Sequence, residues 1–143
     1  NRLREPLWDT LRSNGLAAFE RIVNRVHRIR VKLTFKKVKD NWKLFLAYFD
    51  APDLLGHIHM ARRLERLKKF YQRLDFLAYK LKKNVPEDTI FLIVSDHGMR
   101  PMPDGTGHHS CHAFWSLNID TDWEPKDLTD FYPQIIKWCE VVT

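Results

Sequence analysis

The chain has 143 residues, of which 44% are hydrophobic and 29% are charged, and its formal net charge is +6. This length suits one domain with a hydrophobic core, and the composition argues against a disordered chain. No apolar run approaches the roughly 20 residues that cross a bilayer, and no signal peptide is recognisable. Two cysteines without CxxC spacing exclude a disulfide framework, so a reducing, cytoplasmic setting is predicted.

Residues 1–40 are predicted to form a helical connector region within a single domain that spans residues 1–143. Pro6 suits a first helical turn, and Asn14-Gly15 predicts a break. After the break, apolar residues recur every three to four positions up to residue 29, and residues 31–35 alternate as in a short strand or extended connection. Several arginines lie beside this apolar stripe: Arg21, Arg25, Arg28 and Arg30. They are typical of a solvated basic face, and an anion- or RNA-binding surface is the alternative.

A continuous apolar run at residues 44–49 predicts a strand buried on both faces. Polar residues follow it directly, with Pro52 suited to a first helical turn. If a helix forms there, Asp53 and His57 are four residues apart and share one face. A carboxylate and an imidazole placed in this way are ligands for one divalent metal ion. The alternative is that Asp53 only starts the helix and that His57 lies at the surface.

The clearest predicted helix covers residues 64–83, where leucines and aromatic residues recur at helical spacing and Pro86 marks the end. A second apolar run follows at residues 91–94 and ends in Ser95, Asp96, His97 and Gly98. Strand, helix and strand in this order predict a right-handed crossover between parallel strands. The expected fold is therefore α/β: a three-layer sandwich with a mainly parallel sheet covered by helices. Both polar clusters should then emerge at one edge of the sheet.

Three histidines lie within five residues after a glycine-rich loop: His108, His109 and His112. Residues 113–118 are expected to form another strand, and a helix is expected from about Asp127 to Val142. The histidines are consistent with a structural cluster or with a self-contained zinc site. A lone zinc finger is not expected, because neither cysteine has a CxxC partner.

Three motifs in this order resemble the alkaline phosphatase superfamily, and within it the type I phosphodiesterase/nucleotide pyrophosphatase group. They are Pro52-Asp53-x-x-Gly56-His57, Ser95-Asp96-His97-Gly98-Met99 and Gly107-x-His109-Ser110. The likeness runs from about residue 44 to residue 118, and residues 127–142 are similar to the helix that follows in that group. An alkaline-phosphatase-like fold, present only in part, is what the resemblance implies.

The resemblance also implies a centre with two divalent metal ions, zinc first, with manganese or iron as alternatives. Asp53, His57 and His109 match the ligands of one ion, and Asp96 and His97 match ligands of the other. The Ser or Thr nucleophile of the family and one further Asp ligand have no convincing match in this sequence. The chain is therefore expected to be the C-terminal part of a catalytic domain and to need the N-terminal part as its partner.

The implied activity is metal-dependent hydrolysis of a phosphate-ester small molecule or a nucleotide, with His108 and His112 expected near the substrate. One alternative is a catalytically inactive relic that retains the metal ligands. Another is a basic nucleic-acid-binding domain, although no RNA-binding motif supports it. A membrane partner is not expected, and nucleic acid is not the expected ligand.

Overall fold

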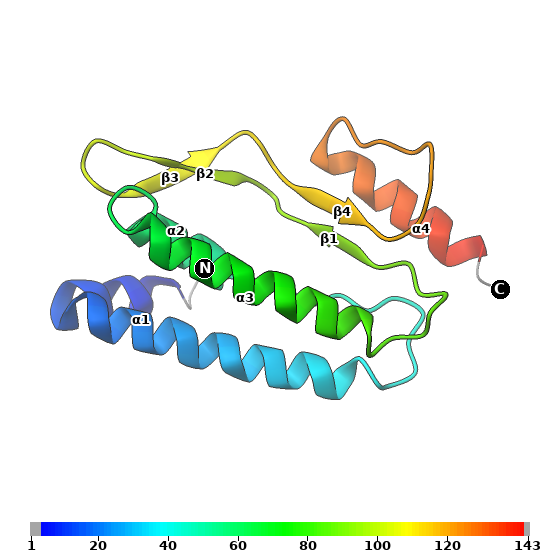
Figure 1. Cartoon of the computed structure of the whole chain (residues 1–143), viewed down its shortest axis with the longest axis horizontal. Coiled ribbons are helices and arrows are strands. Elements are labelled where there is room, and N and C mark those ends of the chain that lie inside the picture. Colours follow the sequence, from blue (N-terminus) through cyan, green and yellow to red (C-terminus); the bar gives the residue numbers. More distant parts are fainter. Residues whose placement is uncertain (1–3, 142–143) are drawn as a thin grey trace.

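The structure is a computed structural model that describes residues 4–141, the first three of them and the last by their backbone alone (Figure 1). Helices dominate, and four short strands follow the third helix. In chain order the elements are α1 (Arg4–Lys37), α2 (Ala51–His59), α3 (Leu64–Lys82), β1 (Leu92–Val94), β2 (Gly98–Pro101), β3 (Gly107–Ser110), β4 (Trp115–Leu117), the 3₁₀ helix η1 (Leu128–Asp130) and α4 (Phe131–Val141).

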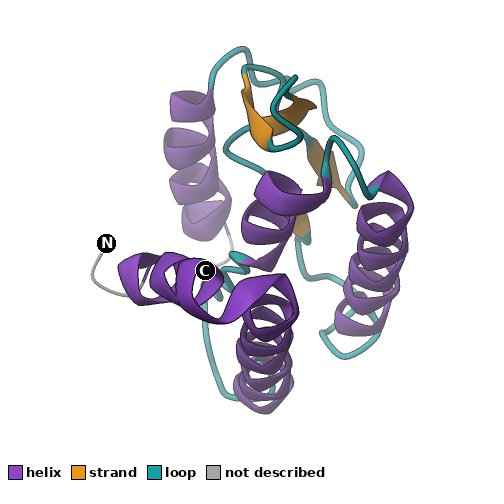
Figure 2. Cartoon of the chain, turned by 90° about the vertical axis from the view of Figure 1, so that its left-hand side faces the viewer, coloured by secondary structure: helices purple, strands orange, loops and turns teal. Residues whose placement is uncertain are grey.

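The hydrophobic core lies where α2 packs against both α1 and α3 (Figures 1 and 2). Each of these helices turns its apolar face inward, as the three- to four-residue spacing predicts. Almost all of the accessible surface of the central side chains is buried: Phe19, Val23, Ala51, Leu54, Leu55, Leu67 and Phe70. The short helix α2 is thus held between two long ones, which fixes the direction of the residues on its remaining face.

Helix α1 is broken at Gly15, as the sequence predicts. Gly15 has φ 76° and ψ 174°, a backbone conformation that residues other than glycine rarely adopt. The arm before the break therefore turns back, and the Trp8 ring stacks on Phe19 with centroids 5.3 Å apart. The predicted strand at residues 31–35 is wrong, because helix α1 continues through these residues to Lys37. An alternation over five residues is too short to outweigh an established helix.

The strands form two separate antiparallel pairs. Strand β1 pairs with β4, with Ile93 opposite Ser116, and β2 pairs with β3, with Met99 opposite His109. The strands expected at residues 91–94 and 113–118 are therefore confirmed as β1 and β4. The described residues thus combine helices with small antiparallel sheets, consistent with a partial α/β domain, and they do not show a parallel three-layer sandwich.

The segment at residues 44–49 differs from its prediction as a buried strand. It has no strand assignment, and the exposed fraction of Leu46 is 86%. Arg30 fastens its end to α1, since one guanidinium nitrogen donates to the carbonyl of Tyr48 at 3.2 Å and another lies 3.0 Å from Asp50. A lone strand has no partners for its backbone groups, so an apolar run cannot become a buried strand without neighbours.

The C-terminal helix begins where the sequence predicts. The Asp127 side chain accepts a hydrogen bond from the Thr129 amide, and Asp130 accepts one from the Asp127 amide, which completes a capping box. Trp123 packs edge-on against Trp138 of α4, with centroids 5.4 Å apart. The predicted end at Val142 lies outside the described residues. In the described part of the chain, no helix has the length and apolar character needed to cross a membrane.

His59 closes α2 inside the core, with 3% of its surface exposed. Its Nε2 atom lies 2.9 Å from Glu20 Oε1, and its Nδ1 atom is buried without a hydrogen-bond partner. Burial lowers the pKa of His59 and outweighs the nearby Glu20 carboxylate, which acts in the opposite direction. A second proton would have to sit on Nδ1, where no acceptor receives it.

The lowered pKa of His59 predicts a loss of stability in mild acid. The unfolded chain binds a proton near pH 6.5 while the folded ring resists it, so the free energy of unfolding should fall as pH drops from about 7 to 5. Urea denaturation across this range measures the fall. A His59→Gln variant should show a smaller fall, whereas Glu20→Gln should retain it. An unchanged fall in His59→Gln would contradict this account.

Candidate metal centre

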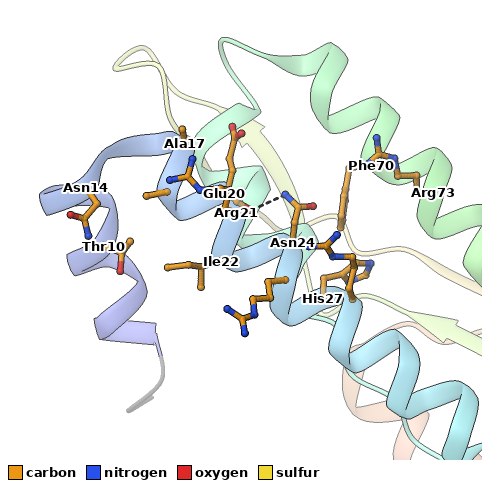
Figure 3. A pocket seen from close by; sticks show the side chains of 13 residues that line it. Thr10, Asn14, Ala17, Glu20, Arg21, Ile22, Asn24, His27, Phe70 and Arg73 are labelled. Atoms are coloured by element: carbon orange, nitrogen blue, oxygen red, sulfur yellow. Dashed lines mark hydrogen bonds between the residues drawn. The ribbon is translucent and has the colours of Figure 1, made fainter.

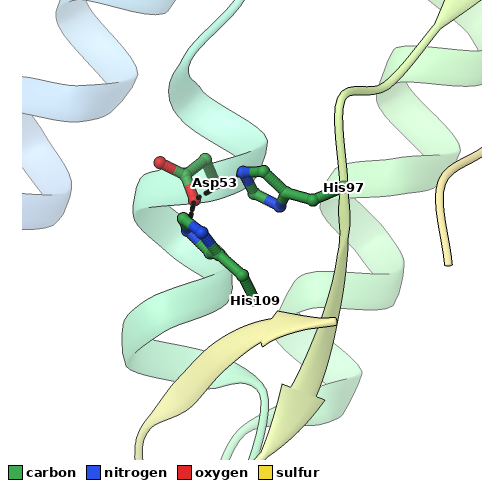
Figure 4. A group of neighbouring side chains, drawn as sticks. All are labelled: Asp53, His97 and His109. Atoms are coloured by element: carbon green, nitrogen blue, oxygen red, sulfur yellow. Dashed lines mark hydrogen bonds and ion pairs between the residues drawn. The ribbon is translucent and has the colours of Figure 1, made fainter. Parts of the chain in front are cut away.

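Four of the predicted ligand residues meet beside helix α2. Asp53 and His57 project from one face of α2, as their four-residue spacing predicts. His97 comes from the turn between β1 and β2, and His109 comes from β3 (Figure 4). The β2–β3 hairpin carries His109 back to the end of β1, so residues more than 50 positions apart come together.

The three imidazoles converge on one carboxylate oxygen, Asp53 Oδ1. His109 Nε2 lies 3.0 Å from this atom, His57 Nε2 lies 3.3 Å away and His97 Nε2 lies 3.8 Å away. The ligand atoms of Asp53, His97 and His109 all lie within 4.8 Å of one another. Donor atoms about 2 Å from a tetrahedral zinc ion lie roughly 3.3 Å apart. The donor set and its spacing therefore fit a divalent cation.

Backbone carbonyls orient two of the imidazoles. His57 Nδ1 lies 2.8 Å from the carbonyl oxygen of Gly107, and His97 Nδ1 lies 3.0 Å from that of Gly98. A carbonyl only accepts, so each Nδ1 carries the proton and each Nε2 presents a lone pair. This assignment follows from the hydrogen bonds and is the form of histidine that binds metal.

Ring contacts support the cluster. The His97 and His109 rings stack with centroids 3.6 Å apart, and His109 Nε2 approaches His57 Nε2 to 3.1 Å. Two imidazole nitrogens this close repel unless a proton or a cation lies between them. On its other side, the His57 ring meets Trp8 of the α1 arm edge-on at 5.8 Å. The arm of α1 thus borders the centre.

Asp96, predicted with His97 for the second ion, is largely exposed, and its Oδ1 atom lies 3.7 Å from His97 Nε2. His97 itself lies with the Asp53 group rather than apart from it. The two residues predicted near the substrate are both exposed. The His108 ring is centred 6.1 Å from that of His109, and His112 Nδ1 lies 3.8 Å from Cys111 Sγ.

Sequence reasoning missed three supports of the centre: Trp8 and the carbonyls of Gly98 and Gly107. Trp8 precedes the break in α1 and carries no sequence signal that links it to residue 57. The glycines do carry a signal, because Gly98 directly follows His97 and Gly107 lies two residues before His109. A Cβ atom on Gly107 would lie 2.3 Å from the carbonyl oxygen of Gly56, so β3 approaches α2 only without a side chain there.

The type I phosphodiesterase/nucleotide pyrophosphatase family model matches residues 3–136, almost the whole chain. The chain therefore belongs to the type I phosphodiesterase/nucleotide pyrophosphatase family, within the alkaline phosphatase superfamily. This confirms the resemblance seen in the three motifs. A search of curated proteins finds no match, and neither does a search of solved structures.

The close approach at Gly107 predicts an asymmetry between two glycine substitutions. In Gly107→Ala the new methyl group meets backbone, whereas in Gly56→Ala it meets the flexible end of Met99. Gly107→Ala should therefore lower the free energy of unfolding by about 1–3 kcal/mol, and Gly56→Ala by less. Chemical denaturation of both variants measures the difference, and a larger loss in Gly56→Ala would contradict the packing described.

The convergence on Asp53 predicts zinc binding by the chain. Asp53→Asn and His57→Ala should each weaken Zn²⁺ binding by about tenfold or more in competition with a chromogenic chelator. His108→Gln provides the matched control, because it removes an exposed imidazole next to a predicted ligand. If His108→Gln costs as much affinity as His57→Ala, binding is a general property of the histidine-rich segment.

Proposed function

We propose that this chain provides the metal-binding side of a phosphoester hydrolase centre of the phosphodiesterase/nucleotide pyrophosphatase type. The observation that carries the proposal is the convergence of three imidazoles on Asp53 Oδ1 in a member of this family. Its substrate would be a phosphate-ester small molecule or a nucleotide. A net charge of +6 supports attraction of such an anion.

The proposed ligands of the first ion are Asp53, His57 and His109, and Asp96 with His97 would contribute to a second. When bound, divalent ions neutralise the phosphate oxygens and stabilise attacking and leaving groups. The protein's own contribution is orientation: helix α2 presents two ligands on one face, and the carbonyls of Gly98 and Gly107 hold the rings with Nε2 toward the centre. Zinc suits this mixture of imidazole and carboxylate, with manganese or iron as alternatives.

His108 and His112 are proposed to face the substrate. His108 belongs to strand β3 and His112 follows this strand, and both side chains are exposed.

Two free cysteines support the predicted reducing, cytoplasmic setting.

The Ser or Thr nucleophile and a further Asp ligand are proposed to come from a separate segment that completes a parallel sheet. The exposed apolar run at residues 44–49 supports this idea. Leu44, Leu46 and Tyr48 are each more than half exposed, so a neighbouring strand would bury them. Burial on both faces is what parallel sheets provide. The finished domain would then be the three-layer sandwich that the sequence predicts.

A metal-binding protein without turnover is the second candidate. It is favoured by the positions of Thr10 and Thr34, the two threonines that precede the apolar run at residues 44–49. Both lie on α1, and Thr34 is buried with 8% of its surface exposed. Neither position resembles a nucleophile presented at a metal centre.

Hydrolysis of bis(p-nitrophenyl) phosphate tests the proposal, using the 143-residue chain and a longer polypeptide that contains it. Turnover should require Zn²⁺ or Mn²⁺ and should disappear with a chelator. Asp53→Asn should lower kcat/KM by about 100-fold or more. Asp75→Asn, which removes an exposed carboxylate from α3, should leave it unchanged. Zinc binding without hydrolysis in either polypeptide would establish the second candidate.

A further inference from the structure

A large groove lies along α1, between the arm that precedes Gly15 and helix α3 (Figure 3). Its volume is about 1330 Å³, above the roughly 300–1,000 Å³ of small-molecule pockets. The α1 arm provides Thr10 and Asn14, and α3 provides Phe70 and Arg73. The break at Gly15 creates one wall of the groove, because it turns the arm back along the helix.

Arginine is the main charged residue of this groove. Arg21, Arg25 and Arg28 follow one another at four- and three-residue spacing, so they form a stripe along one face of α1. Arg73 faces them from α3. In the part of the chain that the structure describes, none of these four guanidinium groups forms an ion pair. Each is exposed and available to an anion.

The one carboxylate that lines the groove does not neutralise these arginines. Glu20 is held by other groups: His59 Nε2 lies 2.9 Å from its Oε1 atom, Arg66 lies 3.2 Å away and Arg63 lies 3.9 Å away. A smaller cavity of about 240 Å³ continues the groove past these residues and adds Lys69 to its lining. The surface is thus a continuous basic track across two helices.

We propose that this groove binds a linear chain of phosphates, as in single-stranded nucleic acid or polyphosphate. Arg21 to Arg28 span seven residues, or about 10 Å of helix. Three guanidinium groups distributed over that length can each contact a different phosphate of an extended chain. The side chains are spread along a line, so they match a repeating anion better than one isolated phosphate. Guanidinium forks pair with phosphate oxygens through two parallel hydrogen bonds.

This site is independent of the proposed hydrolase centre. Leu55 and His59 of α2 line the smaller cavity that continues the groove, whereas Asp53 and His57 face the metal centre. Binding to the groove should therefore persist in the presence of a chelator and in Asp53→Asn. A failure of the hydrolase proposal would leave the groove proposal intact, and the reverse also holds.

Fluorescence anisotropy with a labelled oligothymidylate tests the proposal on the full chain. In the triple variant Arg21→Gln, Arg25→Gln and Arg28→Gln, affinity should fall by about tenfold or more at low salt. The slope of log K against log salt should shrink by about 2, because three phosphate contacts are lost. The matched control is Lys32→Gln, Lys36→Gln and Lys39→Gln, which removes the same charge at exposed positions outside the groove. Its affinity should fall by less than about threefold, and far-UV circular dichroism should show both variants folded.

Competition separates the sources of the phosphate chain. Displacement by polyphosphate at equal phosphate concentration shows that the backbone alone is recognised. Failure of polyphosphate to compete shows that the ligand is single-stranded nucleic acid, whose bases then contribute. Equal competition by poly-glutamate overturns the proposal in favour of an acidic peptide. An equal loss of affinity in the lysine control also overturns it, because general charge then explains the binding.

Discussion

Three imidazole nitrogens surround one carboxylate oxygen, and the rest of this molecule is arranged so that they can do so. Asp53 Oδ1 lies within 3.0–3.8 Å of Nε2 atoms from His57, His97 and His109. Such a concentration of lone pairs is unfavourable without a cation or shared protons, so the surrounding fold must hold it. The buried contacts of α2 with α1 and α3 supply one side, and the β2–β3 hairpin supplies the other. The glycine contact between α2 and β3 sets their separation.

Local patterns predicted the helices well. The apolar spacing in α3, the break at Gly15 and the capping residue Asp127 each act within a few positions, so the sequence displays them directly. The sheet was harder, because pairing depends on distant partners. Residues 44–49 have the composition of a buried strand, yet no strand in the described part of the chain pairs with them. Strand β1 instead found an antiparallel partner at residues 115–117.

The candidate centre, too, was predictable from the sequence only where it depends on local patterns. The pairing of Asp53 with His57 follows from one helical turn, and the family motifs add His97 and His109. The sequence does not show how these side chains are arranged in space. His97 stacks on His109 and thus shares the Asp53 site, while the Asp96 side chain remains mostly exposed to solvent. The contact of Trp8 with His57 depends on the direction of the α1 arm. The two carbonyls that orient the rings belong to Gly98 and Gly107, which the motifs contain, but the motifs do not show which ring each carbonyl contacts.

The exposed run at residues 44–49 has a consequence for how this chain behaves in concentrated solution. It carries exposed apolar side chains, it lies outside every helix and strand, and it is fastened to α1 at its end through Arg30. Extended apolar segments with open backbone groups are templates for intermolecular β pairing. Colloidal stability therefore depends on whatever shields these six residues. The strong positive charge of α1 and α3 opposes self-association at low ionic strength, and added salt weakens that protection.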